Sequence, residues 1–244
     1  MIDKNLARTN FKMHLLAGCV LFLGGFLSIP GQILLPATGF PESLQGMGGS
    51  EAISLFLVNE FAFRVGYLSN AISALLVFFG MIYLAKVSYN KIPNLLSSKP
   101  LLGLAISSGA LRSIWWFALL TQVPLMAKLW QEADSAGKAI INVNYILLND
   151  LLSTIQEDLG VNILGGLFLI LFSVSVFKNK VYPKWVAIMA GIAALSFIAS
   201  SSEFLGIPGG SVLPFIGPTV SGFMFMGIGI LELLRARNVH TKLL

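Results

Sequence analysis

The stretch ISSGALRSIWWFALL, from Ile106 to Leu120, is apolar enough to lie in a bilayer, yet it carries an arginine at position 112. Arg112 lies about eleven residues, or about 16 Å, into the surrounding apolar run, which is close to the middle of a bilayer. A charge at that depth costs about 2.5–3.5 kcal/mol on insertion scales unless it faces protein or water. The stretch therefore predicts a membrane helix that turns Arg112 toward the interior of a helical bundle.

The composition of the whole chain is typical of a membrane protein. Apolar residues make up 56% of the 244 residues and charged residues 11%, against roughly 25% charged residues in soluble domains. Apolar runs of about 20 residues, the length that spans a bilayer, recur without the alternation of a strand. We predict an all-α integral membrane protein, a single domain over residues 1–244. Its six predicted transmembrane helices are Met13–Leu35, Val65–Ala85, Leu101–Ala127, Leu159–Phe177, Trp185–Ile207 and Leu213–Leu234.

Two longer connections are predicted to lie outside the membrane on one side. The first, residues 36–64, contains EAISLFLVNEFAFR, and the second, residues 128–158, contains all but the end of INVNYILLNDLLSTIQEDLG. Apolar residues recur at helical spacing in both. We expect two outer amphipathic segments, the second lying in the membrane interface before the fourth membrane helix.

The distribution of charged residues predicts the orientation. With six helices, four groups of basic residues fall on one side of the membrane, and acidic residues fill the opposite connections. Because cytoplasmic loops are enriched in Lys and Arg, we predict a bacterial inner-membrane protein with both termini in the cytoplasm. The net charge of +5 then reflects topology and does not indicate nucleic-acid binding. The four groups are Lys4, Arg8 and Lys12; Lys86, Lys91 and Lys99; Lys178, Lys180 and Lys184; and Arg235, Arg237 and Lys242.

Parallels along the chain suggest that the second and third helices are repeated in tandem as the fourth and fifth. Asn70 and Asn162 each open an inward-running helix, and each precedes a lysine by sixteen residues. The outward-running helix that follows carries one charged residue, Arg112 in the first unit and Glu203 in the second. Internal repeats of this kind are common in transporters. The alternative is chance similarity, because apolar helices with basic ends resemble one another.

The helix around Arg112 has one polar stripe, on which Ser108, Trp115 and Gln122 follow a three-to-four spacing with the arginine. We expect this stripe to face a polar pocket that opens outward. Arginine keeps its proton, so it needs a carboxylate, a carbonyl, water or an anionic ligand. Glu203 is the first candidate partner, and Asp158 or Glu157 the second. The predicted ligand-binding residues are Arg112, Trp115, Trp116, Glu203, Asn162, Asp158, Arg64 and Asn70.

Three functions are compatible with these residues. In the first, the protein binds or transports a small amphiphilic or anionic molecule, with Arg112 holding the anion and the two tryptophans the apolar body. In the second, it is an intramembrane lipid-modifying enzyme in which Glu203 acts as acid or base. In the third, it is a structural or accessory subunit in which the charges only lock helices together. The sequence identifies no catalytic residue and leaves open whether the protein is an enzyme.

Metal and cofactor chemistry is not expected. Two histidines and one cysteine provide no zinc or haem site, and the chain has no nucleotide-binding glycine motif. The expected partners are the lipid bilayer and a small amphiphilic or anionic ligand, with no nucleic acid, and an oligomer is allowed.

Three stretches carry a resemblance to a known family: FRVGYLSNAISALLVFFGMIYLAKV (Phe63–Val87), LGLAISSGALRSI (Leu102–Ile114) and NILGGLFLILFSVSVFKNKVYPKWVAIMAGIAAL (Asn162–Leu195). They are similar to a bacterial multi-pass membrane family catalogued as domain of unknown function four-three-eight-six. The resemblance covers most of the chain from about Glu51 onward. It implies a membrane protein and no particular activity.

The resemblance also implies functional positions. The family has an arginine before a Gly-x-x-Ser motif, matched by Arg64 with Gly66 and Ser69, and an arginine in the third helix, matched by Arg112. Acidic residues are frequent in the family at two places where this chain has Asn70 and Trp115. Without those carboxylates, Glu203 and the acids of the fourth helix become more important as partners for the arginines.

Overall fold

The computed structural model describes residues 4–39, 47–89, 98–201 and 213–241. Apart from short turns, these residues are helical, and none of them forms a strand, which confirms the predicted all-α class. The helices in chain order are α1 (Lys4–Ala37), α2 (Gly49–Val58), α3 (Glu60–Tyr89), α4 (Ser98–Glu132), α5 (Ser135–Leu152), the π-helix η1 (Ser153–Gly165), α6 (Gly166–Asn179), α7 (Lys184–Ser200) and α8 (Leu213–Thr241).

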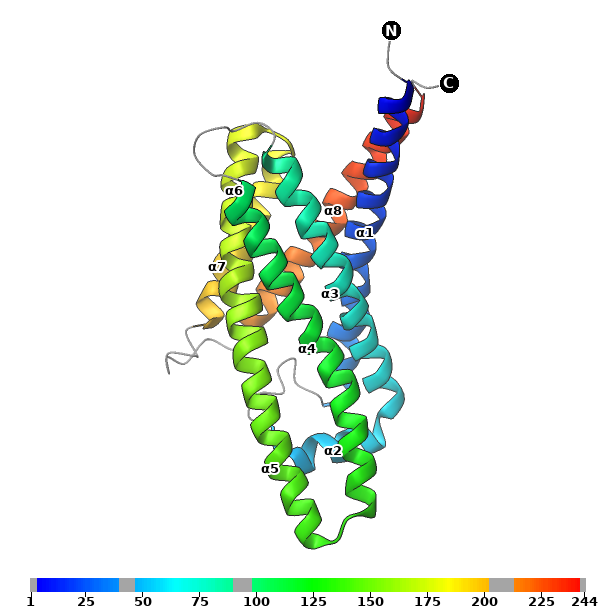
Figure 1. Ribbon diagram of the computed structural model, residues 1–244, viewed down its shortest axis with the longest axis vertical. Helices are drawn as coiled ribbons and strands as arrows, with labels where there is room; N and C mark the ends of the chain where they lie inside the picture. The colour runs from blue at the N-terminus through cyan, green and yellow to red at the C-terminus, as the bar shows by residue number, and fades with distance from the viewer. Residues whose placement is uncertain (1–3, 40–46, 90–97, 202–212, 242–244) are drawn as a thin grey trace.

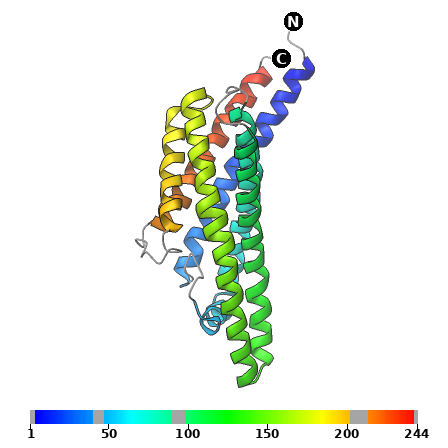
Figure 2. The same cartoon turned by 60° about the vertical axis from the view of Figure 1, so that its left-hand side comes forward.

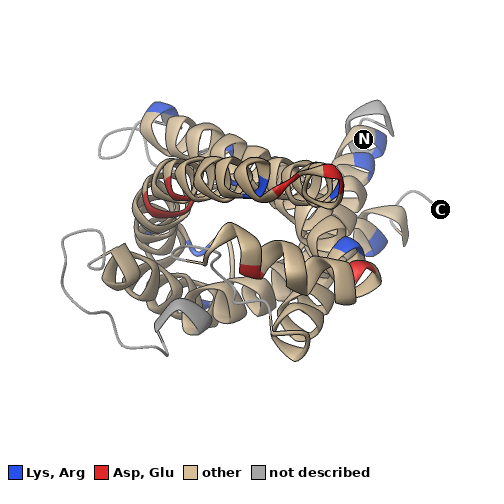
Figure 3. Ribbon diagram, turned by 90° about the horizontal axis from the view of Figure 1, so that it is seen from below, with Lys and Arg blue, Asp and Glu red and all other residues tan. Residues whose placement is uncertain are grey.

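Five helical stretches among these residues are long and apolar enough to cross a membrane: Arg8–Ala37, Glu60–Ser88, Lys99–Glu132, Ser135–Asn179 and Ile216–Thr241. Seen end-on, most of the ribbon carries no charged residue (Figure 3). Many side chains on the outside of the bundle are apolar and exposed, including Leu16, Phe79 and Leu195. An apolar exterior on hydrogen-bonded helices is what a bilayer requires, so the fold is that of a multi-pass membrane protein.

The predicted membrane helix Trp185–Ile207 corresponds to α7, which is not among these five long stretches. α7 has 17 described residues, and residues 202–207 of the predicted helix Trp185–Ile207 lie outside the described part of the chain.

The region between residues 135 and 179 differs from the sequence-based expectation. We expected a separate interfacial helix before the fourth membrane helix, but α5, η1 and α6 form one continuous helix of 45 residues. The wider winding of η1 connects α5 to α6 without a break, because a π-helix bonds each residue to the fifth along the chain and absorbs extra residues. The first expected amphipathic segment forms α2 and the first turn of α3, which are divided at Asn59.

α1, α3, α4, the continuous helix α5–η1–α6, α7 and α8 alternate in direction along the long axis of the molecule, and α2 lies across it (Figures 1 and 2). The start of α1 and the end of α8 lie at one end, with the end of α3, the start of α4 and the α6–α7 connection. The turn from α4 to α5 lies at the opposite end, where the Asp134 carboxylate accepts a 2.8 Å hydrogen bond from the backbone N–H of Gly137 and caps α5. Lys180, with a left-handed φ of 54°, ends α6.

Glycines bring α1 and α8 close together. A Cβ atom on Gly229 of α8 would lie 2.5 Å from the backbone nitrogen of Phe22, and a Cβ atom on Gly25 of α1 would lie 2.5 Å from the carbonyl oxygen of Gly222. Small residues allow helix backbones to approach in this way within membranes, where packing drives association. α1 and α8 therefore form a close pair that also packs against α3 and α7.

Candidate functional site

A cavity of about 130 Å³ lies inside the bundle. Its walls come from α1, α3, α4, η1, α7 and α8. Much of the wall is polar although the surrounding helices are apolar, which is typical of a binding site in a membrane protein. The polar wall residues are Ser28, Gln32, Asn70, Ser73, Arg112, Glu157, Asp158, Asn162 and Ser200.

Arg112 of α4 is half-buried in the cavity wall, as its position on the polar stripe predicted. The structure gives its guanidinium no hydrogen bond and no ion pair with any described residue. A second, smaller cavity of about 20 Å³ also touches Arg112 and lies against Met81 and Phe225. Arg112 thus lies between the larger, polar cavity and the smaller one beside Met81 and Phe225. No described residue balances its charge.

Two tryptophans on the next turn of α4 extend the wall. The side chain of Trp115 is 4% exposed, and its indole N–H has no hydrogen-bond partner in the structure. The ring centroids of Trp115 and Trp116 lie 4.8 Å apart, and Trp116 meets Tyr67 edge-on at 5.6 Å. The cavity therefore places the Arg112 cation and the Trp115 indole N–H beside aromatic surface, a combination that suits an anion that carries an apolar group.

Amides and acids line the cavity beyond Arg112. Asn162 donates a 3.3 Å hydrogen bond from its side-chain amide to the Asp158 carboxylate, one turn earlier on η1. Asn70 of α3 is buried against Gly31 of α1, where a Cβ atom would lie only 2.2 Å from the amide oxygen. Gly31 therefore makes room for the Asn70 amide at the cavity.

The structure brings most of the predicted site residues together. Six of the eight line the cavity: Arg112, Trp115, Trp116, Asp158, Asn162 and Asn70. Arg64 is not in the cavity wall, because it pairs with Glu60 at 2.7 Å at the start of α3, where both side chains are about half-exposed. Glu203 lies outside the described residues.

Sequence reasoning missed a set of buried polar groups on the face of α5 and η1. Three of them, Tyr145, Ser153 and Gln156, follow a helical spacing and are almost completely buried. Each has a buried polar atom without a hydrogen-bond partner in the structure, as does Gln122 of α4. The periodic polar positions in the sequence could have revealed this face, but only the tertiary structure shows that it is buried.

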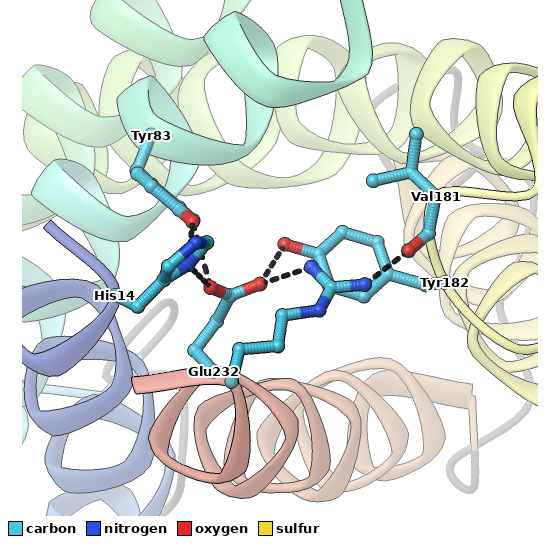
Figure 4. A network of polar contacts seen from close by, with 6 residues as sticks. His14, Tyr83, Val181, Tyr182 and Glu232 are labelled. Atoms are coloured by element: carbon cyan, nitrogen blue, oxygen red, sulfur yellow. Dashed lines mark hydrogen bonds and ion pairs between the residues drawn. The ribbon is translucent and has the colours of Figure 1, made fainter. Parts of the chain in front are cut away.

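Sequence reasoning also missed Glu232, which is completely buried on α8 nine residues before this helix ends at Thr241 and whose contacts are drawn in Figure 4. Its Oε1 accepts hydrogen bonds from Tyr182 Oη at 2.8 Å and Arg235 Nη1 at 2.6 Å. Its Oε2 accepts one from Tyr83 Oη at 2.8 Å and contacts His14 Nδ1 at 2.5 Å. The available signal was an acid within the apolar run GFMFMGIGILELL. We call these five residues the Glu232 cluster.

No group of His, Cys, Asp and Glu side chains among the described residues is placed to hold a metal ion. No known protein family, curated protein or solved structure matches the chain. Arguments about function therefore depend on the cavity and its chemistry.

Proposed function

We propose that the protein binds a small anionic or amphiphilic molecule in the Arg112 cavity and carries it across a membrane. The observation that supports this most strongly is the Arg112 guanidinium, which lies beside a cavity inside the bundle and forms no ion pair with a described carboxylate. A charge within a membrane bundle needs a counter-charge or water, and an anionic ligand would supply the counter-charge. The Trp115 indole N–H would donate to the same anion, and Trp116 would contact its apolar part.

We also propose six membrane crossings, with both termini in the cytoplasm of a bacterium and the protein in its inner membrane. α7 is about 26 Å long at 1.5 Å per residue, close to the roughly 30 Å of hydrocarbon in a bilayer. It runs antiparallel to α6, and α8 returns toward the end where α1 begins (Figure 1). The described members of the four basic groups lie in helix ends or the α6–α7 connection at that end, which supports its placement in the cytoplasm.

The cavity supports the proposed tandem repeat of the second and third helices as the fourth and fifth. Asn70 and Asn162, which hold equivalent positions in the two proposed units, line the same cavity. Two related units that face each other would produce this arrangement. Membership in the family named above is proposed from the sequence stretches alone.

Anion binding can be tested with the purified full-length protein in detergent. Its midpoint of thermal unfolding is measured with benzoate, dodecanoate or inorganic phosphate, because a ligand that binds only the folded state raises this midpoint. We expect at least one of the three anions to stabilise the wild-type protein. Arg112→Gln should lose this stabilisation, and Arg112→Lys should keep part of it, since lysine retains the charge without the planar fork.

Arg64→Gln is the matched control, because it removes an exposed arginine that does not line the cavity. Size-exclusion chromatography checks that each variant is folded. Equal stabilisation of the wild type and of a folded Arg112→Gln variant would refute the proposal. So would the absence of any stabilisation by the three anions together with no bound anion in native mass spectrometry. Uptake of the stabilising anion into liposomes then tests transport.

A second candidate function is lipid modification, for which Glu157 and Asp158 provide the supporting observation. These adjacent acids line the same cavity as Arg112 and supply carboxylates for acid–base chemistry. If the protein were an enzyme, Asp158→Asn would lose turnover of a radiolabelled phospholipid extract while the benzoate-induced stabilisation persisted. Absence of turnover by the wild-type protein would exclude this candidate.

A further inference from the structure

The carboxylate at the centre of the Glu232 cluster has a complete set of donors. Its two oxygens are contacted by four side chains, His14, Tyr83, Tyr182 and Arg235. A carboxylate offers about four lone-pair sites, so these contacts fill them. Burial and the neighbouring Glu232 raise the pKa of the Tyr182 phenol above its usual value, which keeps this phenol protonated as a donor. The cluster is therefore built around a charged Glu232.

The cluster connects four parts of the chain at the end near the termini (Figure 4). His14 comes from α1, Tyr83 from α3, Tyr182 from the α6–α7 connection, and Glu232 and Arg235 from α8. Arg235 also donates to the Val181 carbonyl, and its guanidinium lies 4.8 Å from the centroid of the Tyr182 ring. The α1–α8 pair is thereby tied to α3 and to the connection between α6 and α7.

The Glu232 cluster is aligned with the Arg112 cavity along two helices. On α1, the residues His14, Leu21 and Ser28 are seven apart, and on α8 the residues Pro218, Phe225 and Glu232 are also seven apart. Seven residues make about two turns, so each set lies on one helix face. Ser28 and Pro218 line the cavity, Leu21 and Phe225 lie in the apolar core, and His14 and Glu232 belong to the cluster. One line through the bundle thus leads from the cavity, through a layer of buried apolar side chains, to the cluster.

The two helices also contain prolines at the level of the cavity. Pro30 lies inside α1, beside the cavity residue Gly31, and Pro218 lies inside α8. A proline within a helix removes a backbone hydrogen bond and bends the helix. α1 and α8 are packed closely through glycines, so a change at one of these helices bears directly on the other.

We propose that the Glu232 cluster is a proton-binding gate at the cytoplasmic end of the Arg112 cavity, and that a proton on His14 holds the gate closed. This inference rests on the transport function proposed above. The His14 side chain is 25% exposed whereas Glu232 is fully buried, so His14 is the member of this pair that solvent reaches. Histidine is the side chain whose charge ordinarily changes between about pH 5 and pH 8.

The proton acts through the contact between His14 Nδ1 and Glu232 Oε2. When His14 is protonated, an imidazolium faces the carboxylate at 2.5 Å and adds ionic attraction to the hydrogen bond. When the imidazolium releases its proton to water, Arg235 is left as the one cation beside Glu232 among the described contacts. The other titratable groups that contact Glu232, Tyr83 and Tyr182, are neutral donors. Loss of the proton therefore weakens the contact between α1 and α8, and the gate opens as the cytoplasmic pH rises.

The gate can be tested by the reactivity of a buried cysteine next to the Glu232 cluster, which water-soluble reagents should reach only when the gate is open. Ile228 is completely buried on α8, one turn before Glu232. In the full-length chain with Cys19→Ala, an Ile228→Cys substitution is labelled with a water-soluble maleimide at about pH 5.5 and about pH 8. Each rate is divided by the rate for the same protein unfolded in dodecyl sulfate at the same pH, because thiol ionisation also rises with pH.

We expect the normalised rate to rise by about tenfold between the two pH values, which corresponds to the loss of about one charge-assisted contact. His14→Gln should abolish the dependence on pH. Glu232→Gln should give the fast rate at both pH values. Glu60→Gln, which removes a partner from a half-exposed ion pair at the other end of α3, should behave like the unmodified protein.

Size-exclusion chromatography again checks that each variant is folded. If Glu232→Gln unfolds, Tyr83→Phe replaces it, because this substitution removes one hydrogen-bond donor to the Glu232 carboxylate. A normalised rate that is independent of pH in the parent protein would overturn the gate, as would an unchanged rate in the folded Glu232→Gln or Tyr83→Phe variant. Stabilisation by benzoate, dodecanoate or phosphate is measured on the same samples. If an anion stabilises the protein but the rates do not respond, the gate alone fails. If the rates respond but no anion stabilises the protein and none is found bound by native mass spectrometry, the proposed transport function fails.

Discussion

The α1–α8 contact is the feature whose energetic contribution the structure defines most sharply, and Gly229→Ala tests it. A methyl group at this position would lie 2.5 Å from the backbone nitrogen of Phe22 and 2.8 Å from its Cα and Cβ atoms. Ordinary contact begins at 3.4 Å, so the two helices would have to part locally by about 0.9 Å. No side-chain rotation relieves this overlap, because two of the three nearest atoms belong to the backbone of α1.

The cost follows from the loss of contact between the two helices. A gap of about 0.5–1 Å already removes a quarter to a half of the dispersion energy of an atom pair. Overpacking of this kind typically costs about 1–3 kcal/mol. Alanine also stabilises a helix by about 0.5–1 kcal/mol relative to glycine, which offsets part of the cost. We therefore expect Gly229→Ala to lower the free energy of unfolding by up to about 2.5 kcal/mol.

The matched control is Gly103→Ala in α4. A Cβ atom at Gly103 would meet no atom within 4 Å, so this variant should show only the helix-propensity gain of about 0.5–1 kcal/mol. The difference between the two variants then isolates the steric cost, about 1–3 kcal/mol. Reversible unfolding by dodecyl sulfate in mixed micelles, followed by tryptophan fluorescence, measures both. Equal effects of the two substitutions would refute the close approach of α1 and α8.

Two further predictions concern the cavity and the buried polar face beside it. Gly31→Ala would place a methyl group 2.2 Å from the amide oxygen of Asn70 and push this amide into the cavity. About tenfold more anion should then be needed for the same rise in the unfolding midpoint. A titration of the unfolding midpoint with the anion measures this change. The midpoint without ligand should change little, because the amide lies at the end of a flexible side chain. Ser153→Ala removes a completely buried hydroxyl that has no hydrogen-bond partner among the described residues. The free energy of unfolding should therefore stay the same or rise by up to about 1 kcal/mol, and a clear loss of stability would contradict this account.

The candidate site was largely predictable because the bilayer leaves a charged residue few choices. A helix with 3.6 residues per turn places the polar residues around Arg112 on one face, and hydrocarbon excludes that face from the lipid. The same argument placed Asn70 and Asn162 on inward faces, where the structure finds them in one cavity. Arg64 was assigned to the site without such a constraint, since it lies at the start of a helix where its charge can pair with Glu60 at the surface.

The sequence by itself determined the class of the protein, most of its membrane helices and the face on which Arg112 lies, because these follow from local composition and helical period. Only the tertiary structure decided which groups meet across helices. His14 and Glu232 are separated by 218 positions, and no periodicity relates them. The continuous helix through η1 and the missing carboxylate partner of Arg112 among the described residues were likewise decided by packing. The physical reason is that helical periodicity defines the direction of a side chain, whereas its partner depends on how all the helices pack together.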